Sequence, residues 1–329
     1  MDERTLARTG LPVTELGFGA ASLGNLFRET TDAEAEAAVD AAWALGIRYF
    51  DTAPHYGLGL SERRLGRALQ KYPRDEYVIS TKVGRLLVPN EHKTGRDNDG
   101  FIVPDDVVRQ WDFSRDGVRR SLDASLERLG LDRVDILYAH DPDQADPDAG
   151  IRVAPFLMEL REQGVVNAVG VGTNSGREAA RLLSRTDLDL AMLAGRYTLL
   201  EQDSLDDALR VASATGKSIV AVGVFNSGLL ATDVPASDAR YDYEPAEARL
   251  IARVEAIADV CSGFGVTVPQ AAIAFPLCHR SVVNVTLGMR NAAQVHRNAE
   301  LYRARVPVDL WAELAAAGLI RVDAGPGDS

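Results

Sequence analysis

The chain has 329 residues, which is enough for one α/β barrel or for two domains of average size. Hydrophobic residues make up 46% of it and charged residues 26%, so a disordered or fibrous protein is excluded. The formal net charge is −12. Because a surface that binds phosphates must be basic, this charge argues against nucleic acid as a partner.

The N-terminal sequence MDERTLARTG is too polar for a secretory signal, and no apolar run reaches the roughly 18 residues of a membrane helix. We therefore expect a cytoplasmic protein with no membrane partner. The two cysteines, Cys261 and Cys278, lack CxxC spacing. We expect both to be buried structural thiols.

The first predicted element is a β-hairpin over residues 4–16, where polar and apolar residues alternate on both sides of a Thr-Gly pair. We expect this hairpin to plug the bottom of a barrel. The next predicted helix begins after Thr31, which matches a capping box with Glu34, and ends at Gly46. Farther along the chain, Ser61 is expected to cap another helix.

Apolar runs typical of buried strands recur along the chain. They cover residues 16–20, 47–52, 77–82, 134–140, 167–173, 190–195, 218–225 and 281–288. A stretch of helical periodicity follows each run. Strands that alternate with helices pair in parallel through right-handed crossovers. Eight such units predict a (β/α)8 TIM barrel better than two doubly wound domains.

We expect this barrel to form one domain over residues 1–320, because no Pro/Gly/Ser-rich linker interrupts it, and residues 321–329 to be a disordered tail. Two segments depart from the short loops usual in such a fold. Residues 84–113 are far longer than a typical βα loop, and residues 232–245 precede an extra helix near the C-terminus. Long segments of this kind commonly act as lids or binding loops.

Four titratable side chains fall at or just after predicted strand ends. Asp51 ends the second strand, Tyr56 follows on its loop, Lys82 ends the third strand, and His140 ends the fourth. Catalytic groups of a barrel gather at this end of the strands. Taken singly, each has an ordinary structural explanation, such as a turn cap, a solvated lysine or a core histidine. Their occurrence together favours an active site.

The residue types suit proton transfer to or from an alcohol or carbonyl oxygen. A phenol has a pKa of about 10, so Tyr56 needs a nearby cation to favour its phenolate. Lys82 is a candidate for that cation, Asp51 for the group that holds it, and His140 for a donor to the substrate oxygen. The chain shows no nucleophile beside a base and no cluster of metal ligands, so zinc or serine-triad hydrolysis is not supported.

Interconversion of an alcohol and a carbonyl needs a hydride carrier. The sequences Gly17-Phe18-Gly19 and Gly170-Val171-Gly172 both begin like a dinucleotide fingerprint, but neither completes GxGxxG. A Rossmann site is therefore not expected. A nicotinamide cofactor would have to lie across the loops at the barrel rim.

The motifs match a known family. GFGAASLG (17–24), FDTAPHYGLGLSERRLG (50–66), STKVGR (80–85), RLGLDRVDILYAHDPD (128–143), VGVGTNS (169–175) and LGMRNAAQVHRN (287–298) carry the resemblance. Over nearly its whole length the chain resembles the aldo-keto reductases. Within that family it is most similar to the sugar 1-dehydrogenase branch, which acts on fucose, galactose or D-threo-aldoses, with pyridoxal 4-dehydrogenases nearby.

The resemblance implies that Asp51, Tyr56, Lys82 and His140 form a catalytic tetrad, with Tyr56 as the proton-transfer residue. It also implies a set of cofactor-binding residues. These are Thr173 and Asn174 near the nicotinamide, Phe225, Asn226, Ser227 and Leu229 along the pyrophosphate, and Gly288, Arg290, Gln294 and Asn298 around the adenosine. No metal is implied.

The chain departs from the family pattern at several positions. Ala194 falls where the family has a glutamine, and Val222 near its stacking aromatic residue. Gly288 and Gln294 replace a phosphate-binding lysine and an arginine, which favours NAD over NADP. Arg290 and Arg297 are nevertheless candidates to restore that positive charge.

The leading hypothesis is an NAD(P)-dependent dehydrogenase that oxidises the C1 hydroxyl of an aldose to a lactone. Pyridoxal 4-dehydrogenation and NADPH-dependent reduction of a general aldehyde are the alternatives within the same chemistry. A cofactor-binding regulatory module is the alternative of another class, and the intact tetrad argues against it. The expected partner is a small sugar or aldehyde. The oligomeric state, monomer or small homo-oligomer, is left open.

Overall fold

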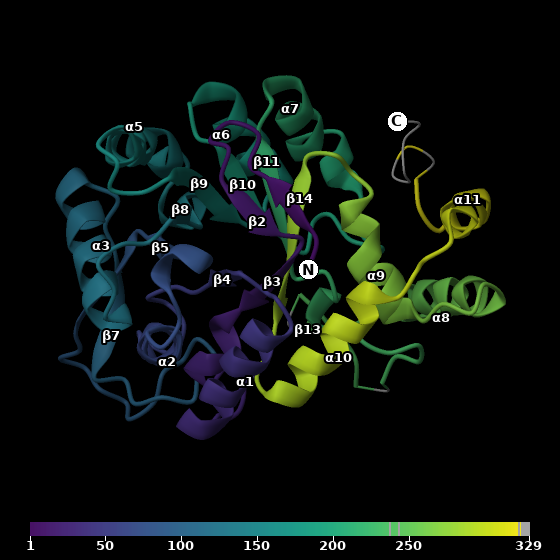
Figure 1. The fold of residues 1–329 in the computed structure, drawn as a ribbon, viewed down its shortest axis with the longest axis horizontal. Coiled ribbons are helices and arrows are strands. Elements are labelled where there is room, and N and C mark those ends of the chain that lie inside the picture. Colours follow the sequence, from purple (N-terminus) through teal and green to yellow (C-terminus); the bar gives the residue numbers. More distant parts are fainter. Residues whose placement is uncertain (237, 243, 322, 324–329) are drawn as a thin grey trace.

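The computed structural model describes residues 1–236, 238–242, 244–321 and 323. Its central strands are β3 (Leu16–Gly19), β4 (Tyr49–Asp51), β5 (Val78–Val83), β8 (Ile136–His140), β9 (Ala168–Thr173), β10 (Leu190–Ala194), β11 (Ser218–Val222) and β14 (Val282–Gly288). They pair in parallel and close into a barrel in the order β10-β11-β14-β3-β4-β5-β8-β9 (Figure 1). The predicted (β/α)8 barrel and its eight strands are therefore confirmed.

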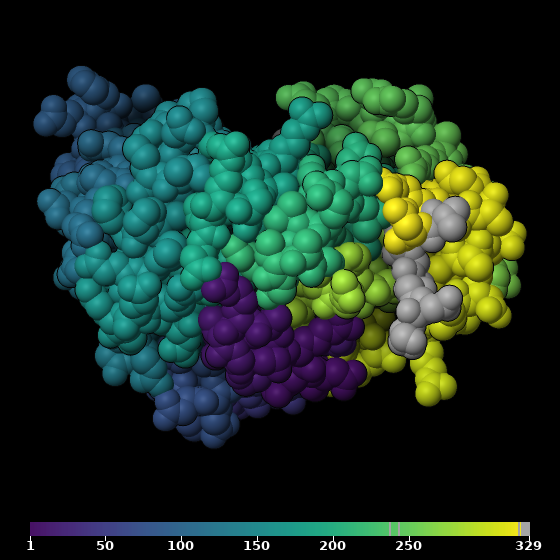
Figure 2. Space-filling view, turned by 90° about the horizontal axis from the view of Figure 1, so that it is seen from above, coloured from purple at the N-terminus to yellow at the C-terminus, as the bar shows by residue number. Residues whose placement is uncertain are grey.

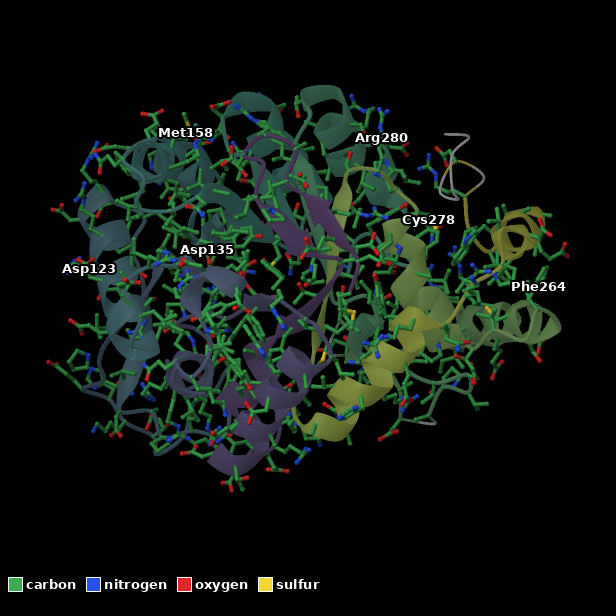
Figure 3. All side chains as sticks on the ribbon, viewed as in Figure 1. Asp123, Asp135, Met158, Phe264, Cys278 and Arg280 are labelled. Carbon is green, nitrogen blue, oxygen red and sulfur yellow. The ribbon has the colours of Figure 1, made fainter. Side chains whose placement is uncertain are left out.

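Helices form the outer layer of the barrel. They are α1 (Asp32–Ala44), α2 (Leu60–Leu69), α3 (Arg115–Leu129), α4 (Pro142–Ala145), α5 (Ala149–Glu162), α6 (Gly176–Arg185), α7 (Ala208–Thr215), α8 (Ala248–Gly263), α9 (Val268–Leu277), α10 (Ala292–Arg303) and α11 (Val308–Ala316). Asp123 on α3 and Met158 on α5 mark this layer in Figure 3. Among the described helices none is long and apolar enough to span a membrane by itself. Only α8 and α9 together pass that test, and they are bent by 91°.

The predicted helix ends are correct in one case and wrong in another. Thr31 and Glu34 form the expected capping box at the start of α1. Ser61, however, lies inside α2, whose N-cap is Gly59. The buried Ser61 hydroxyl instead donates to the Ala20 carbonyl at 2.7 Å and contacts the Thr52 hydroxyl at 2.8 Å. It links three segments that are distant in the sequence, which a local pattern does not reveal.

The N-terminal hairpin consists of β1 (Glu3–Thr5) and β2 (Pro12–Thr14), paired antiparallel as predicted. Leu6 and Val13 are buried against interior side chains of the barrel strands. The Ala7 N–H donates to the Ser218 hydroxyl, at the first residue of β11, at 3.1 Å. The hairpin thus closes the end of the barrel where the strands begin, and Figure 2 shows it in purple on that surface.

The long segment 84–113 forms a β-ribbon, which we call the ribbon, although the sequence predicted only a loop. Its arms are β6 (Arg85–Pro89) and β7 (Val107–Trp111), paired antiparallel. An isolated bridge joins its tip to the loop after β3, through Phe101 and Leu26. The second long segment contains the short pair β12 (Arg240–Tyr241) and β13 (Glu244–Pro245), with positions 237 and 243 outside the described residues.

Neither cysteine forms a disulfide. Cys261 is buried in α8, whereas Cys278, labelled in Figure 3, is half-buried after α9. Burial raises the pKa of Cys261 to about 11 and that of Cys278 to about 12, so both remain protonated at neutral pH. The predicted disordered tail lies almost wholly outside the described residues.

Candidate active site

The structure brings the four predicted site residues together at one end of the barrel. Asp51 is the last residue of β4, Lys82 lies near the end of β5, and His140 is the last residue of β8. These strands are consecutive neighbours in the barrel. Tyr56 lies in the turn between β4 and α2, on the same side.

Asp51 and Lys82 form a buried ion pair. The Lys82 ammonium donates to Asp51 Oδ2 at 2.7 Å and to the Thr52 carbonyl at 3.0 Å. The two charged side chains are only 5% and 2% exposed. A buried ammonium keeps its charge when a carboxylate and a second acceptor hold it, and the predicted partnership of Asp51 and Lys82 is present in the structure.

The turn that carries Tyr56 is held by a close backbone contact. Gly57 has a φ of +61°, and a Cβ there would lie 2.2 Å from the Gly24 carbonyl oxygen. Gly24 in turn lies against the Tyr56 backbone, where a Cβ would approach within 2.6 Å. Both positions therefore require glycine. This contact positions the Tyr56 ring, whose centroid is 4.8 Å from Lys82 Nζ.

The protonation states follow from burial and from this ion pair. Burial raises the pKa of Tyr56, and the opposing effect of Lys82 does not cancel it. Burial alone would lower the pKa of Lys82, but Asp51 and Tyr56 outweigh it and the pKa is raised. Lys82 lowers the pKa of Tyr56, as expected, but burial raises that pKa by more. Tyr56 is therefore a protonated phenol at neutral pH in the free protein.

His140 completes the group. Its ring meets that of Tyr56 edge-on, with the ring centroids 6.0 Å apart. Burial, together with the positive charges of Lys82 and Arg85, holds the pKa of His140 well below its usual value, so the imidazole is neutral. Its buried Nδ1 has no hydrogen-bond partner among the described residues. A neutral imidazole at this place is suited to hydrogen-bond a substrate oxygen.

Two residues that sequence reasoning did not single out also border the group. The His55 ring lies 5.5 Å from that of His140, and burial, with Arg85 nearby, lowers its pKa to about 2. Phe101, at the tip of the ribbon, packs on His55 at 5.3 Å and on Tyr56 at 6.1 Å. His55 lies inside the motif 50–66 and was detectable there. Phe101 carried no local signal, because its contact depends on how the ribbon folds.

The predicted nicotinamide and pyrophosphate residues follow β9 and β11. Thr173 is buried at the end of β9, where its hydroxyl accepts from the Ser175 N–H at 3.1 Å, and Asn174 is exposed beside it. Asn226 is buried after β11 with a φ of 45°, and its Oδ1 has no partner within the described part of the chain. Such an unpaired acceptor fits a ligand that donates a hydrogen bond. In the same turn, Ser227 is exposed and Leu229 is buried.

The residues predicted to bind the adenosine differ in their exposure and in whether other residues already hydrogen-bond them. Gly288 is exposed, and a Cβ there would meet nothing within 4 Å. Gln294 is exposed and accepts from the Arg290 N–H at 2.8 Å, while Asn298 is buried. Arg290 is 7% exposed, and its guanidinium donates to the Arg28 carbonyl at 2.9 Å and to the Thr30 hydroxyl at 2.6 Å. The Arg290 guanidinium therefore already has hydrogen-bond partners within the chain.

Arg297 is exposed but already donates to the Ala231 carbonyl at 3.1 Å. The two departures noted in the sequence, Ala194 and Val222, are half-buried at the ends of β10 and β11. The glycines of the two GxG sequences lie in the strands β3 and β9. A Cβ at Gly17 would lie 2.5 Å from the Thr286 hydroxyl, and one at Gly170 2.4 Å from the Leu190 carbonyl, so these glycines allow the barrel strands to pack.

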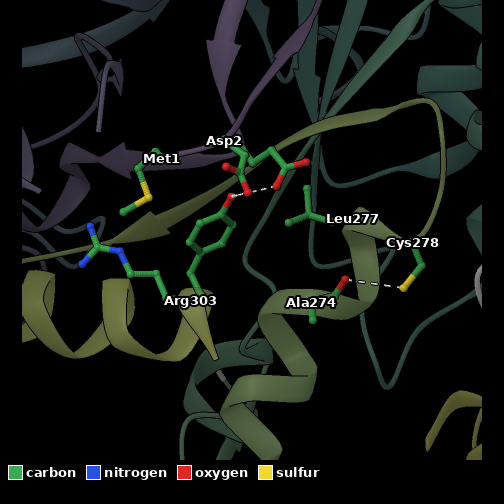
Figure 4. A pocket seen from close by; sticks show the side chains of 8 residues that line it. Met1, Asp2, Ala274, Leu277, Cys278 and Arg303 are labelled. Carbon is green, nitrogen blue, oxygen red and sulfur yellow. Dashed lines mark hydrogen bonds between the residues drawn. The ribbon is translucent and has the colours of Figure 1, made fainter. Parts of the chain in front are cut away.

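A separate depression lies at the opposite end of the barrel (Figure 4). It has a volume of about 400 Å³ and is lined by Asp2, Glu15, Tyr302 and neighbouring residues. Glu15 immediately precedes β3, so this depression is at the end where strands begin. Tyr302 donates to Glu15 there at 2.8 Å. None of its lining residues belongs to the group around Tyr56.

A closed parallel barrel with an acid, a lysine, a phenol and a histidine at its carboxyl end has the form of a barrel enzyme. Comparison with known proteins makes the class specific. The chain belongs to the aldo/keto reductase family, whose model matches residues 15–318. It is an oxidoreductase that uses a nicotinamide cofactor and acts on a small molecule, and the predicted family resemblance is confirmed.

Two relatives cover nearly the whole chain. The D-threo-aldose 1-dehydrogenase of Pseudomonas sp. is 50% identical over 322 residues, which is 97% of this chain and 98% of the relative. The pyridoxal 4-dehydrogenase of Microbacterium luteolum is 39% identical over 339 residues, with the same coverage of 97% and 98%. Among solved structures, an aldo-keto reductase from Bacillus halodurans in its holo form has a TM-score of 0.77 at 24% identity. That alignment covers 98% of this chain and 97% of the other, and it supports the fold.

Proposed function

We propose that this aldo/keto reductase oxidises the C1 hydroxyl of a cyclic aldose to a lactone, with NAD or NADP as the cofactor. The observation that carries the proposal is the buried Asp51–Lys82 pair beside Tyr56, because it provides a proton acceptor next to a fixed positive charge. The relative that is 50% identical along almost its full length supports the choice of an aldose.

In this direction Tyr56 accepts the proton of the C1 hydroxyl, and Lys82 stabilises the phenolate that receives it. Asp51 holds the Lys82 ammonium in place. The neutral His140 hydrogen-bonds the C1 oxygen and fixes its orientation. A nicotinamide cofactor, when bound, supplies the acceptor for the hydride that leaves C1. Reduction of the carbonyl is the reverse, with the protonated Tyr56 as the acid.

The residues after β9, β11 and β14 would hold that cofactor. In the closed barrel, β9 lies beside β8 of the tetrad, whereas β11 and β14 neighbour each other and β3 separates β14 from β4. The unpaired Asn226 Oδ1, the exposed Ser227 and the open space over Gly288 are compatible with a dinucleotide lying across this rim. Because Gly288 offers no charge and Arg290 is engaged by the loop after β3, NAD is favoured over NADP.

The test is a panel of aldoses assayed with NAD and with NADP, preceded by fluorescence titration with NADH and NADPH. We expect turnover of at least one aldose with formation of a lactone, and tighter binding of NADH. Strong turnover of another substrate class with no oxidation of any aldose would refute the proposal.

Pyridoxal oxidation is the second candidate, favoured by the relative that is 39% identical. Pyridoxal belongs in the same panel, as does reduction of simple aldehydes with NADPH. Each substrate uses the same proton transfer at Tyr56, so the ratio of kcat/KM values ranks them. Location in the cytoplasm, the oligomeric state and the extent of the domain stay predictions.

A further inference from the structure

Asp141, directly after His140, has a backbone conformation that turns its carboxylate back toward the active site. Its φ is 43° and its ψ is 53°, in the left-handed region that few residues other than glycine adopt. The Asp141 N–H donates to the Gly172 carbonyl at 2.8 Å, which holds the turn against β9. As a result, Asp141 Oδ2 lies 3.6 Å from His140 Nε2. Unfavourable conformations of this kind cluster at functional sites.

Arg85, the first residue of β6 in the ribbon, pairs with the same oxygen of this carboxylate. Its Nη2 donates to Asp141 Oδ2 at 2.7 Å and to Gln144 Oε1 at 3.1 Å. Its guanidinium lies over the Trp111 ring at 4.3 Å. The Arg85 Nε is buried and has no hydrogen-bond partner in the described part of the chain. The side chains of Arg85 and Asp141 are 12% and 19% exposed, so the pair is largely buried but a ligand can still reach it.

The tetrad does not use this pair. Asp51 holds Lys82, and the proton moves through Tyr56, so neither Asp141 nor Arg85 donates or accepts the transferred proton. A largely buried ion pair is also weak support for stability, because desolvation offsets much of its attraction. Its position beside His140 therefore points to contact with substrate.

We propose that Asp141 and Arg85 form a subsite for the hydroxyl on C2 of the aldose. This inference rests on the proposed function. An oxygen on C1 that is bound at His140 Nε2 brings the neighbouring substituents of C1 beside Asp141. Of these neighbours the ring oxygen can only accept, whereas the C2 hydroxyl can donate, and a carboxylate requires a donor. Arg85 supplies the complementary donor to the same hydroxyl oxygen. The substrate class is thus a 2-hydroxy aldose.

The experiment compares pairs of sugars that differ only at C2, ribose with 2-deoxyribose and galactose with 2-deoxygalactose. For the full-length wild-type enzyme we expect kcat/KM to be about 10- to 100-fold higher for the 2-hydroxy member, as for loss of one charged hydrogen bond. Asp141→Asn, which tolerates the left-handed backbone, and Arg85→Met should bring that ratio close to one. They should do so by slowing the 2-hydroxy sugar while the 2-deoxy sugar changes little.

Asp146→Asn is the matched control, because it removes the same charge next to α4 but its carboxylate pairs with Arg152. It should leave the ratio unchanged. Binding of NADH to each variant checks that the fold and the cofactor site are intact. Equal slowing of both sugars by the variants, or a wild-type enzyme that oxidises aldoses without preferring the 2-hydroxy member, would overturn this inference and leave the proposed function standing. Absence of any aldose oxidation would overturn both.

Discussion

The Ser80 hydroxyl donates to Asp51 Oδ1 at 2.7 Å, and so binds the carboxylate oxygen that Lys82 leaves free. The Ser80 oxygen also lies 3.0 Å from the Tyr49 hydroxyl, which is 3.2 Å from that of Tyr138. All these groups are buried inside the barrel. A hydrogen-bonded chain thus extends from the barrel interior to the ion pair beside Tyr56, and its members act by positioning Asp51.

Ser80→Ala should weaken both stability and catalysis. The substitution leaves Asp51 Oδ1 buried without its donor, which should lower the free energy of unfolding by about 1–3 kcal/mol. Burial raises the pKa of Asp51 and the Ser80 hydrogen bond opposes that rise, so the substitution should raise this pKa further and move the acidic limb of the kcat profile to higher pH. Ser121→Ala is the control, because the buried Ser121 hydroxyl has no partner among the described residues. An unchanged pH profile in Ser80→Ala would contradict the positioning role.

Tyr56→Phe should remove proton transfer and keep cofactor binding. We expect kcat to fall by about 10²- to 10⁴-fold, the usual contribution of a positioned acid or base. Titration with NADH should give an unchanged dissociation constant. Tyr72→Phe is the matched control, since the Tyr72 hydroxyl donates to Asp40 on the outer layer. A regulatory module would lose nothing on replacement of Tyr56, so retention of full function would support that alternative.

Oxidation and reduction should depend differently on pH. Because burial raises the pKa of Tyr56, only a small fraction of the phenol is deprotonated at neutral pH. Oxidation needs the phenolate, so its kcat/KM should rise by up to about tenfold per pH unit between pH 7 and 9. Reduction needs the phenol and should not rise over that range. Parallel profiles in the two directions would show that Tyr56 is not the group that titrates.

The buried histidines should make the fold less stable in mild acid. The pKa values of His55 and His140 are lowered in the folded protein, mainly by burial. Below about pH 6.5 the unfolded chain takes up protons that the folded chain does not, so stability is lost as the pH falls. The loss should be about 2 kcal/mol for each histidine between pH 7 and 5.

Urea unfolding of the wild type and of His55→Gln at both pH values measures this effect. In His55→Gln the fall in unfolding free energy between pH 7 and 5 should be smaller than in the wild type by about 2 kcal/mol, the contribution of one histidine. His296→Gln, on the exposed face of α10, should retain the full difference. If His55→Gln and wild type show the same change in unfolding free energy, the assignment to His55 is wrong.

Gly288→Lys should shift the cofactor preference toward NADP. Position 288 is exposed with open space around it, so a lysine fits without displacing a neighbour. A cation there should raise the affinity for NADPH about tenfold relative to NADH. Ala312→Lys on α11 adds the same charge elsewhere and should change neither. An equal gain for both cofactors would show that position 288 does not face the 2′-phosphate.

Local patterns predicted the fold because they follow from local physics. A buried parallel strand requires an apolar run, and a capped helix requires residues such as Thr31 within one turn of Glu34. The placement of Asp51, Lys82 and His140 followed too, because parallel strands bring their carboxyl ends to one rim.

Other features depended on contacts between distant segments. The ribbon pairs Arg85 with Trp111 across a long polar tip, residues 90–106, so no short turn between the two arms sets this register in the sequence. Ser61 was expected to cap a helix, but the Ala20 carbonyl and Thr52 hydroxyl hold it elsewhere. Arg290 was expected to lie near the adenosine, and the sequence did not predict that its guanidinium donates to carbonyls of the loop after β3.

The sequence by itself determined the barrel and the family and predicted the four candidate site residues, since these follow from periodicity and from short motifs. Only the tertiary structure decided the protonation state of Tyr56, because burial depends on what the folded chain places around the ring. It also decided that Asp141 and Arg85 meet beside His140, since one follows β8 and the other begins the ribbon. The reaction class was therefore readable from local residues, whereas the environment that selects a substrate arises from long-range packing.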